Sequence, residues 1–222
     1  TEKPVNRIQP LVSVVTITYQ HSPYIRQCLD SILMQETDFP YEIIIGEDGS
    51  TDSTREICIE YANAHPDRIR LFLRDRILSH YTDSQGRTTR FNGHFTRAEA
   101  RGKYIAICEG DDYWINKKKL SMQVNFLNNN QMAIGCCTNF FIYNQNYKFM
   151  SALKNLNKIQ VIKFRDILIS NTIGTLTVMY RNVLSDKLLP EQLLYLWYGD
   201  RSIWSLLLLI GDFFKIPEYT AV

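Results

Sequence analysis

The sequence predicts an α/β fold in which a mostly parallel central sheet carries helices on both faces. Segments rich in β-branched and apolar residues alternate with segments whose apolar residues recur at helical spacing. The connections between them are short, which is typical of β-α-β units. With 222 residues, 45% of them hydrophobic, the chain is long enough to bury one sizeable core.

The first third of the chain predicts three strands and two helices. Val12–Tyr19 is almost continuously apolar or β-branched, as a strand buried on both faces should be. Pro23 is favoured in the first turn of a helix, and apolar residues at helical spacing continue to Leu33. The remaining predictions are a strand at Tyr41–Ile45, a helix at Ser53–Ala64 and a strand at Ile69–Leu73.

The rest of the chain continues the alternation after an irregular segment. Arg74–Asn92 is polar and has no clear period, so we expect a long loop there, and such loops are usually functional. A short helix ends at Ala98–Arg101. The further predictions are strands at Tyr104–Cys108, Ala133–Tyr143 and Leu176–Tyr180, and helices at Lys117–Asn130, Lys163–Ser170, Asp186–Tyr195 and Asp200–Ile210.

Charge and hydropathy exclude several classes of protein. The 25 basic and 23 acidic residues nearly balance, unlike the basic face of a nucleic-acid binder, so we expect no nucleic-acid partner. A local basic run, Lys117–Lys119, is expected to be a solvated helix face. The most apolar run, Ile203–Ile210, is far shorter than the roughly 20 residues of a membrane span. It predicts a buried helix and no transmembrane segment.

The five cysteines indicate buried free thiols. Their number is odd and no C-x-x-C pair is present, which argues against zinc or redox chemistry. The adjacent Cys136 and Cys137 are expected to point to the two faces of one strand.

Acidic residues follow two predicted strands and begin one predicted helix. Glu47-Asp48 follows the second strand, Asp111-Asp112 follows the strand at Tyr104–Cys108, and Asp200 opens the helix that ends at Ile210. Ligands bind at the carboxyl ends of strands in such sheets. Each group alone is also typical of an ordinary turn or helix cap. Two adjacent carboxylates repel each other unless a cation or sugar hydroxyls offset the charge.

Four segments in this order resemble glycosyltransferase family 2, whose members are inverting, nucleotide-sugar-dependent enzymes with the Rossmann-like GT-A fold. Val12–Gln20 looks like the family's opening V-S-V-I-I-P-T-Y-N, and Glu47–Asp52 is similar to its D-D-G-S-T-D. Gly102–Asp112 resembles its G-x-Y-I-A strand and D-x-D motif, and Gly199-Asp200 resembles the site of its catalytic base.

The resemblance covers about residues 12–210 and has a few departures from the family pattern. Ile17 replaces proline, Gln20 replaces asparagine, Glu47 replaces the first aspartate of D-D-G-S, and Gly199 replaces the glutamate before the base.

Carried over to this sequence, the resemblance implies a donor site. Thr18 and Tyr19 would line the nucleotide pocket, with Tyr19 against the base, and Glu47 would accept a hydrogen bond from the base imide. Asp111 would hold the ribose or metal-bound waters. Asp112 would ligate Mn²⁺ or Mg²⁺ bridging the diphosphate, since hard carboxylate and phosphate oxygens suit these cations.

The resemblance also implies a single displacement with an aspartate as general base. Asp200 would take the proton of the attacking hydroxyl, and the anomeric centre would invert. Trp114, Trp197 and Tyr198 could stack on an acceptor sugar, although ordinary packing in the core or at its rim accounts for them equally well.

The implied activity is hexosyl or deoxyhexosyl transfer from a nucleoside-diphosphate sugar to a saccharide or glycan. UDP is the favoured nucleotide, with dTDP and GDP as alternatives. Surface polysaccharide or glycan synthesis is the expected role, in the cytoplasm or at the cytoplasmic face of a membrane. One domain would comprise a nucleotide-sugar-binding half, residues 12–115, and an acceptor-binding half, residues 116–222. Since the sequence does not begin with Met, it could be part of a longer protein.

Three other interpretations are weaker. A nucleotidyltransferase that makes nucleotide-sugars usually opens with a Gly-rich loop, and Val12–Gln20 contains no glycine. A dehydrogenase would need G-x-G-x-x-G after the first strand, which is absent. A sugar-nucleotide-binding module without turnover is disfavoured by the presence of both Asp112 and Asp200.

Overall fold

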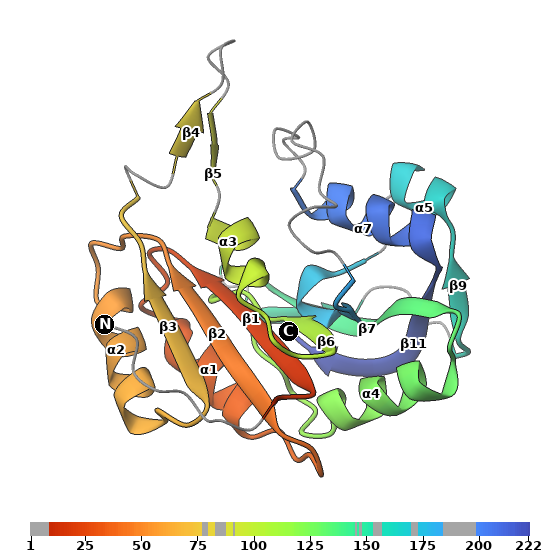
Figure 1. Cartoon of the computed structure of the whole chain (residues 1–222), viewed down its shortest axis with the longest axis horizontal. Coiled ribbons are helices and arrows are strands. Elements are labelled where there is room, and N and C mark those ends of the chain that lie inside the picture. Colours follow the sequence, from red (N-terminus) through yellow and green to blue (C-terminus); the bar gives the residue numbers. More distant parts are fainter. Residues whose placement is uncertain are drawn as a thin grey trace.

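A computed structural model describes residues 9–76, 80–82, 88–90, 92–144, 146, 148–152, 157–169, 173–183 and 199–222. Its main sheet has the strand order β3-β2-β1-β6-β10-β7-β11-β9, and β8 pairs with β7 (Figure 1). The predicted α/β class is confirmed: the sheet is mixed but largely parallel, with helices on both faces.

One half of the sheet is parallel and aligns the strand ends where acidic residues were predicted. It contains β1 (Val12–Thr18), β2 (Tyr41–Glu47), β3 (Ile69–Leu73) and β6 (Tyr104–Ile107). Thr18 of β1 is opposite Glu47 of β2, and Val15 of β1 is opposite Ile107 of β6. The carboxyl ends of β1, β2 and β6 therefore lie at one edge.

The other half of the sheet is mixed. β10 (Met179–Arg181) runs antiparallel between β6 and β7 (Ala133–Asn144), and β11 (Asp212–Ala221) runs parallel to β7. β9 (Gln160–Ile162) and β8 (Phe149–Ala152) are antiparallel to β11 and β7. Sequence patterns did not predict β8, β9 or β11.

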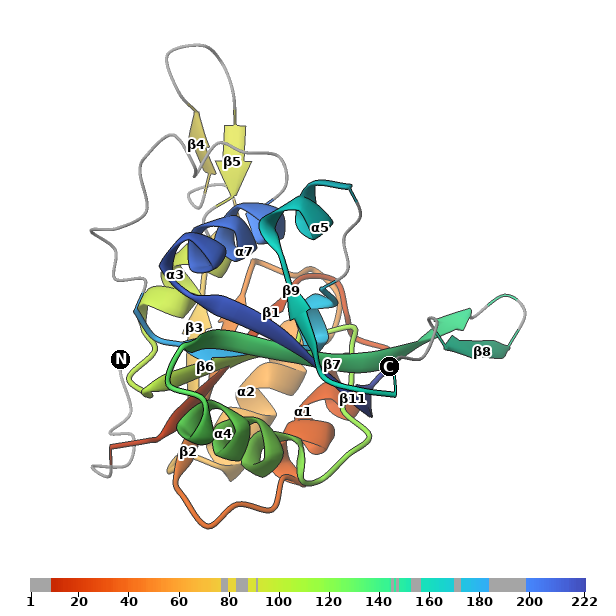
Figure 2. The ribbon, with the colours of Figure 1, turned by 90° about the vertical axis from the view of Figure 1, so that its right-hand side faces the viewer.

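The helices form two layers, one on each face of the sheet (Figure 2). One layer holds α1 (Ile25–Leu33), α2 (Thr54–Ala64) and α4 (Lys119–Asn129), and the other holds α3 (Asn92–Ala98), α5 (Phe164–Ile169) and α7 (Gly199–Ile210). Cys136 belongs to the core on the first face and Cys137 to the core on the second, as predicted. All five cysteines are free and buried, which confirms the sequence prediction.

Several element predictions need correction. The segment expected to be an irregular loop before Asn92 contains a hairpin of β4 (His80–Thr82) and β5 (Thr88–Arg90). The strand expected at Leu176–Tyr180 is a short 3-10 helix, η1 (Thr175–Thr177), followed by β10. The helix predicted at Asp186–Tyr195 lies outside the described residues. No helix in the described part is long and apolar enough to cross a membrane.

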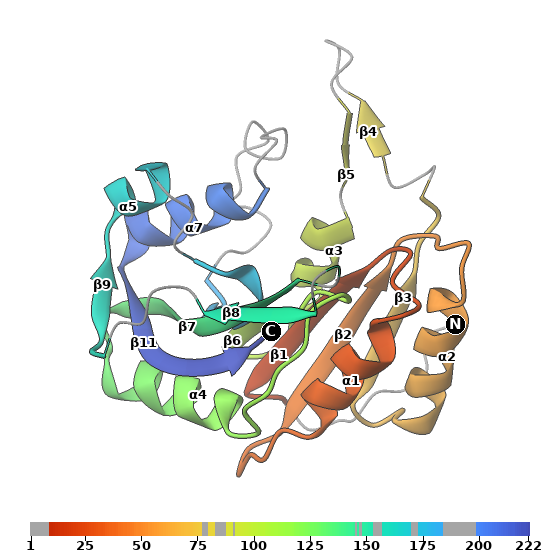
Figure 3. The same cartoon turned by 180° about the vertical axis from the view of Figure 1, so that it is seen from behind.

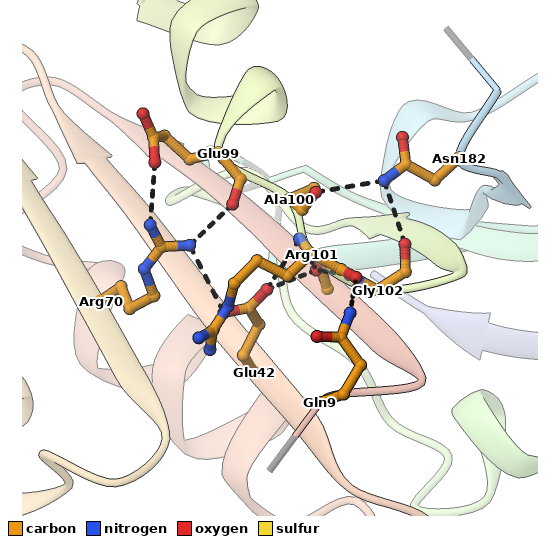
Figure 4. A network of polar contacts seen from close by, with 9 residues as sticks. Gln9, Glu42, Arg70, Glu99, Ala100, Arg101, Gly102 and Asn182 are labelled. Atoms are coloured by element: carbon orange, nitrogen blue, oxygen red, sulfur yellow. Dashed lines mark hydrogen bonds and ion pairs between the residues drawn. The ribbon is translucent and has the colours of Figure 1, made fainter. Parts of the chain in front are cut away.

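A buried carboxylate ties the amino ends of the parallel strands together (Figure 4). The Glu42 side chain is 3% exposed and accepts two bonds from the Arg101 guanidinium, at 2.7 and 3.0 Å. It also accepts a 2.7 Å bond from Ser13 Oγ and lies 3.5 Å from Arg70. Arg70 in turn bonds the Glu99 carboxylate at 2.8 Å. The network therefore joins β1, β2 and β3 to the segment that leads into β6.

The segment that enters β6 is also held by residues next to the two strands that pair with β6, which are β1 and β10. Asn182, just after β10, donates from its amide to the carbonyls of Ala100 and Gly102, and Gln9 donates to the carbonyl of Arg101 (Figure 4). Gly102 packs so closely on β1 that a Cβ there would lie 2.5 Å from the Ser13 nitrogen. The start of β6 is thus fixed before its acidic end is reached.

We expect Glu42→Gln to destabilise the protein by about 3 kcal/mol, because Arg101 loses its counter-charge and Arg70 keeps only that of Glu99. Urea unfolding followed by circular dichroism measures the change. Glu60→Gln is the matched control: Glu60 makes a similar bidentate pair with Arg26, but both side chains are at least half exposed. Equal losses in the two variants would contradict a special role for the Glu42 network.

Candidate active site

The acidic segment after β6 is bonded to the end of β1. The Gly110 nitrogen donates to the Ile17 carbonyl at 3.0 Å, so Glu109–Asp112 turns across the carboxyl end of β1. The Asp48 nitrogen donates to the Thr18 carbonyl, also at 3.0 Å. Both acidic turns predicted from the sequence therefore meet at β1.

Gly110 allows a close contact that any side chain would prevent. A Cβ at this position would lie 2.5 Å from Thr18 Oγ1 and 2.8 Å from His21 Nδ1. Both of these buried polar atoms lack a hydrogen-bond partner among the described residues, and His21 Nδ1 lies 3.8 Å from an Asp111 carboxylate oxygen. Unsatisfied buried polar atoms are costly, so a cluster of them indicates a place for a polar ligand.

Four carboxylates share one electrostatic environment, and we call them the acid cluster: Glu109, Asp111, Asp112 and Asp200. Burial, followed by the charges of Asp200, Asp112 and Asp111, raises the pKa of Glu109 to about 8. Burial and the charge of Asp111 raise the pKa of Asp112 to about 7. Asp200, distant in sequence, therefore lies near the acidic turn in space.

Asp200 is held by a side chain from η1. It lies in the first turn of α7, where a negative charge is favoured by the helix dipole. Its Oδ2 accepts a 2.7 Å hydrogen bond from Thr175 Oγ1, which fixes one carboxylate oxygen. Asp200 is partly buried.

Glu47 stabilises the turn after β2, and its side chain is fully buried. One carboxylate oxygen accepts from the Ser50 nitrogen at 2.6 Å, and the other accepts from Arg55 Nε. The expected contact between Glu47 and a nucleotide base is therefore not supported, because this carboxylate is buried and bonded on both oxygens by the protein.

Tyr19 and Asp48 meet through an arginine. The Arg76 guanidinium lies 3.3 Å from the centre of the Tyr19 ring and donates a 2.7 Å bond to Asp48. One face of the Tyr19 ring is therefore covered by Arg76, and the contact between Tyr19 and a nucleotide base stays a prediction.

Trp114 is a core residue. It is 1% exposed, its indole nitrogen donates to the Leu176 carbonyl at 2.9 Å, and Lys119 lies 4.4 Å from its ring centre. The prediction that Trp114 stacks on an acceptor sugar is corrected, because neither face of its ring is open to a ligand. Trp197 and Tyr198 lie outside the described residues.

The carboxylates of the acid cluster can supply some of the ligands of a divalent cation, while the remaining ligands would come from another molecule. Among the described residues, no group of three or more His, Cys, Asp or Glu side chains is placed to hold a metal ion by itself. Burial, followed by the charge of Asp111, nevertheless raises the pKa of Asp112, and carboxylate oxygens are the ligands that Mg²⁺ and Mn²⁺ prefer. Such a cation would need phosphate or water oxygens to complete its coordination.

Comparison with known proteins places the chain in a family. Residues 13–80, which include β1, β2 and β3, match the model of glycosyl transferase family 2. The chain belongs to glycosyltransferase family 2. A curated relative in Bacillus subtilis, the putative teichuronic acid biosynthesis glycosyltransferase TuaG, is 31% identical over 172 residues. These are 77% of this chain and 62% of TuaG. The chain spans about half the length of other curated relatives that it matches.

Solved structures share the GT-A-like fold of this family 2 chain. Residues 1–349 of Staphylococcus aureus TarS, in complex with UDP, superpose with a TM-score of 0.66 at 18% identity, covering 95% of this chain and 59% of that one. The mannosyltransferase PcManGT of Pyrobaculum calidifontis, in complex with GDP-Man and Mn²⁺, gives a TM-score of 0.63 at 17% identity, covering 98% and 58%.

The family motifs located part of the site and missed other residues. Thr18 lies close to Gly110 of the turn that carries Asp111 and Asp112, and the charge of Asp200 acts on Glu109 of the same turn. The roles of these residues and of Tyr19 stay predictions. Glu109 could have been found, because it precedes Asp111 by two residues, the D-x-D spacing. Three further site residues carry no sequence signal of their own: His21, Arg76 and Thr175.

We expect Glu109→Gln to stabilise the protein at pH 8 by roughly 1–3 kcal/mol. The folded-state pKa of Glu109 is raised to about 8, so its ionised form is disfavoured by folding. The cost is absent below the unfolded pKa of about 4.3 and grows as the pH rises toward the folded value. Thermal unfolding at several pH values measures it. A stabilisation independent of pH would contradict this electrostatic origin.

Proposed function

We propose that this chain is the catalytic domain of a metal-dependent, inverting glycosyltransferase that moves a hexosyl or deoxyhexosyl group from a nucleoside-diphosphate sugar to a glycan hydroxyl. One observation carries the proposal: the acidic turn after β6 lies across the carboxyl end of β1, beside the buried Thr18 Oγ1, which has no hydrogen-bond partner among the described residues. Support comes from the similar folds that bind UDP in TarS and GDP-Man with Mn²⁺ in PcManGT.

The donor would bind across the carboxyl end of β1. Thr18 would line the nucleotide pocket, Asp111 would hold the ribose or metal-bound waters, and Tyr19 would stack on the base of UDP, dTDP or GDP. The unpartnered Thr18 Oγ1 and the exposed Asp111 carboxylate suit this role. Glu47 would contribute indirectly, since it fixes the turn that carries Asp48.

Asp112 would hold Mn²⁺ or Mg²⁺ together with oxygens of the diphosphate. When bound, such a cation supplies positive charge to the diphosphate as it leaves the sugar. Asp112 needs to be deprotonated for this contact, and its raised pKa makes that step sensitive to pH near neutrality.

Asp200 would act as the general base. An acceptor hydroxyl is a poor nucleophile, so a carboxylate that takes its proton lowers the barrier to attack on the anomeric carbon. Thr175 would keep one carboxylate oxygen bonded and so orient the other toward the hydroxyl. Attack from the side opposite the leaving diphosphate inverts the anomeric centre.

Surface polysaccharide or glycan synthesis, in the cytoplasm or at the cytoplasmic face of a membrane, is the role we propose. TuaG is named for teichuronic acid biosynthesis, which supports this choice of acceptor class. In this arrangement residues 12–115 would bind the donor and residues 116–222 the acceptor.

Nucleotide binding should depend on a divalent cation and on Asp112. The binding of UDP, dTDP and GDP is measured by calorimetry, each with and without Mn²⁺. At least one nucleotide should bind in the presence of Mn²⁺, and its affinity should fall about tenfold or more in Asp112→Asn. Affinity should rise between about pH 6 and pH 8 as Asp112 loses its proton. Cation-independent binding, or no binding to any of the three, would contradict the donor site.

Asp200→Asn should lower the rate of sugar transfer by about 100-fold or more, since the amide cannot accept the proton. Nucleotide binding in the same variant should stay close to the wild-type value, which separates loss of the base from loss of the donor site. Transfer is measured as nucleoside diphosphate released in the presence of acceptor. Full transfer activity in Asp200→Asn would remove this residue from the mechanism.

A further inference from the structure

A cavity of about 610 Å³ opens beside Asp111 and Asp112. Tyr24 and Gln27 at the start of α1 form one wall. The end of β7 and the paired β8 form the other, and we call this cavity the hairpin pocket. The β7–β8 pair projects from the body of the molecule (Figure 2), and Figure 3 shows β8 in front of the sheet.

The hairpin side of the pocket offers aromatic and aliphatic surface to solvent. Tyr143 and Met150 face each other across the two strands and are 46% and 45% exposed. Deeper along β7, the Phe141 ring stacks on Tyr219 with 4.5 Å between ring centres, which makes that wall rigid. Exposed apolar surface gathered on a concave site indicates a binding partner.

The polar groups of the pocket are acidic or neutral. Asp111 and Asp112 lie at one end, and Gln27 adds an amide that can both donate and accept. None of the described residues that line the pocket is a lysine or an arginine. Apart from the cation proposed at Asp112, a phosphate-rich occupant would therefore meet no positive charge in this pocket, whereas a neutral occupant with many hydroxyls could bond Gln27.

The pocket is also connected to the residue that holds Asp200. Leu176 of η1 lines it, and the preceding residue, Thr175, donates to the Asp200 carboxylate. Phe140, another lining residue, packs against Gly174, where a Cβ would lie 2.4 Å from the ring. An occupant of the pocket therefore contacts both the carboxylates after β6 and the segment that positions Asp200.

We propose that the hairpin pocket binds a neutral saccharide as the acceptor, with Tyr143 stacking on the apolar face of a sugar ring and Gln27 bonding its hydroxyls, next to the donor that Asp111 and Asp112 would hold. The proposal rests on the glycosyltransferase function proposed above. It assigns acceptor recognition to the β7–β8 hairpin, in place of the buried Trp114.

The test uses saturation-transfer difference NMR with neutral di- and trisaccharides of glucose, galactose and N-acetylglucosamine. At least one should bind the wild type, and Tyr143→Ala should weaken that binding about tenfold, the size of one lost aromatic stacking contact. Tyr143→Phe should retain it, because the ring face is kept. Met150→Ala should also weaken it, whereas Met132→Ala should not. Met132 is 77% exposed and absent from the lining of the pocket.

Calorimetry with UDP and Mn²⁺ in the same variants separates this proposal from the proposed function. Unchanged nucleotide binding together with weakened saccharide binding supports the hairpin pocket. Saccharide binding that survives Tyr143→Ala, or no binding of any panel member, overturns it while leaving the donor site intact. Preferential binding of glucose 1-phosphate, or of phosphatidylcholine vesicles, also overturns it, since the occupant would then be an anion or a lipid.

Discussion

The burial of Glu42 between two arginines is the constraint on which the candidate site depends. Parallel strands keep a fixed register, so fixing their amino ends determines where their carboxyl ends stop. Glu42 joins β1, β2 and β3 to the residues just before β6 through bonds to Ser13, Arg70 and Arg101. A slip of one residue in β6 would turn the side chains of this strand to the other face of the sheet and would displace the acidic turn that follows it. The network lies at one end of the strands and sets the geometry of the chemistry at the other.

The protein balances its acidic turns in two different ways. After β2, Glu47 and Asp48 are each paired with an arginine of this chain, Arg55 and Arg76. After β6, neither Asp111 nor Asp112 forms an ion pair with a lysine or arginine in the described part of the chain, and the pKa of Asp112 is raised instead. The charges of the first turn are therefore paired within the described part of the chain, while those of the second are not. Motif matching treats the two turns alike and does not detect this contrast.

The buried parallel strands could be predicted because each is a continuous run of β-branched and apolar residues, as in Val12–Thr18. β11 could not, since Pro217 and interspersed polar residues argue against a strand, and pairing with β7 overrides that local signal. The burial of Trp114 depends on the same strand, because Trp114 bridges to Ala221. Lys119 was expected at a solvated face. It is fully buried, and it bonds Gln123 and the Thr177 carbonyl, partners that only the tertiary fold supplies.

The position of β10 has a consequence for folding kinetics. This three-residue strand sits between β6 and β7, and both neighbours precede it by many residues in the chain. Until β10 arrives, β6 and β7 present unpaired edges, which are templates for association with other chains. Contacts of such long sequence separation form slowly, because the entropy of closing the intervening loop must be overcome first. We therefore expect the joining of the two halves of the sheet, and with it the meeting of Asp200 and the acidic turn, to be a late event in folding.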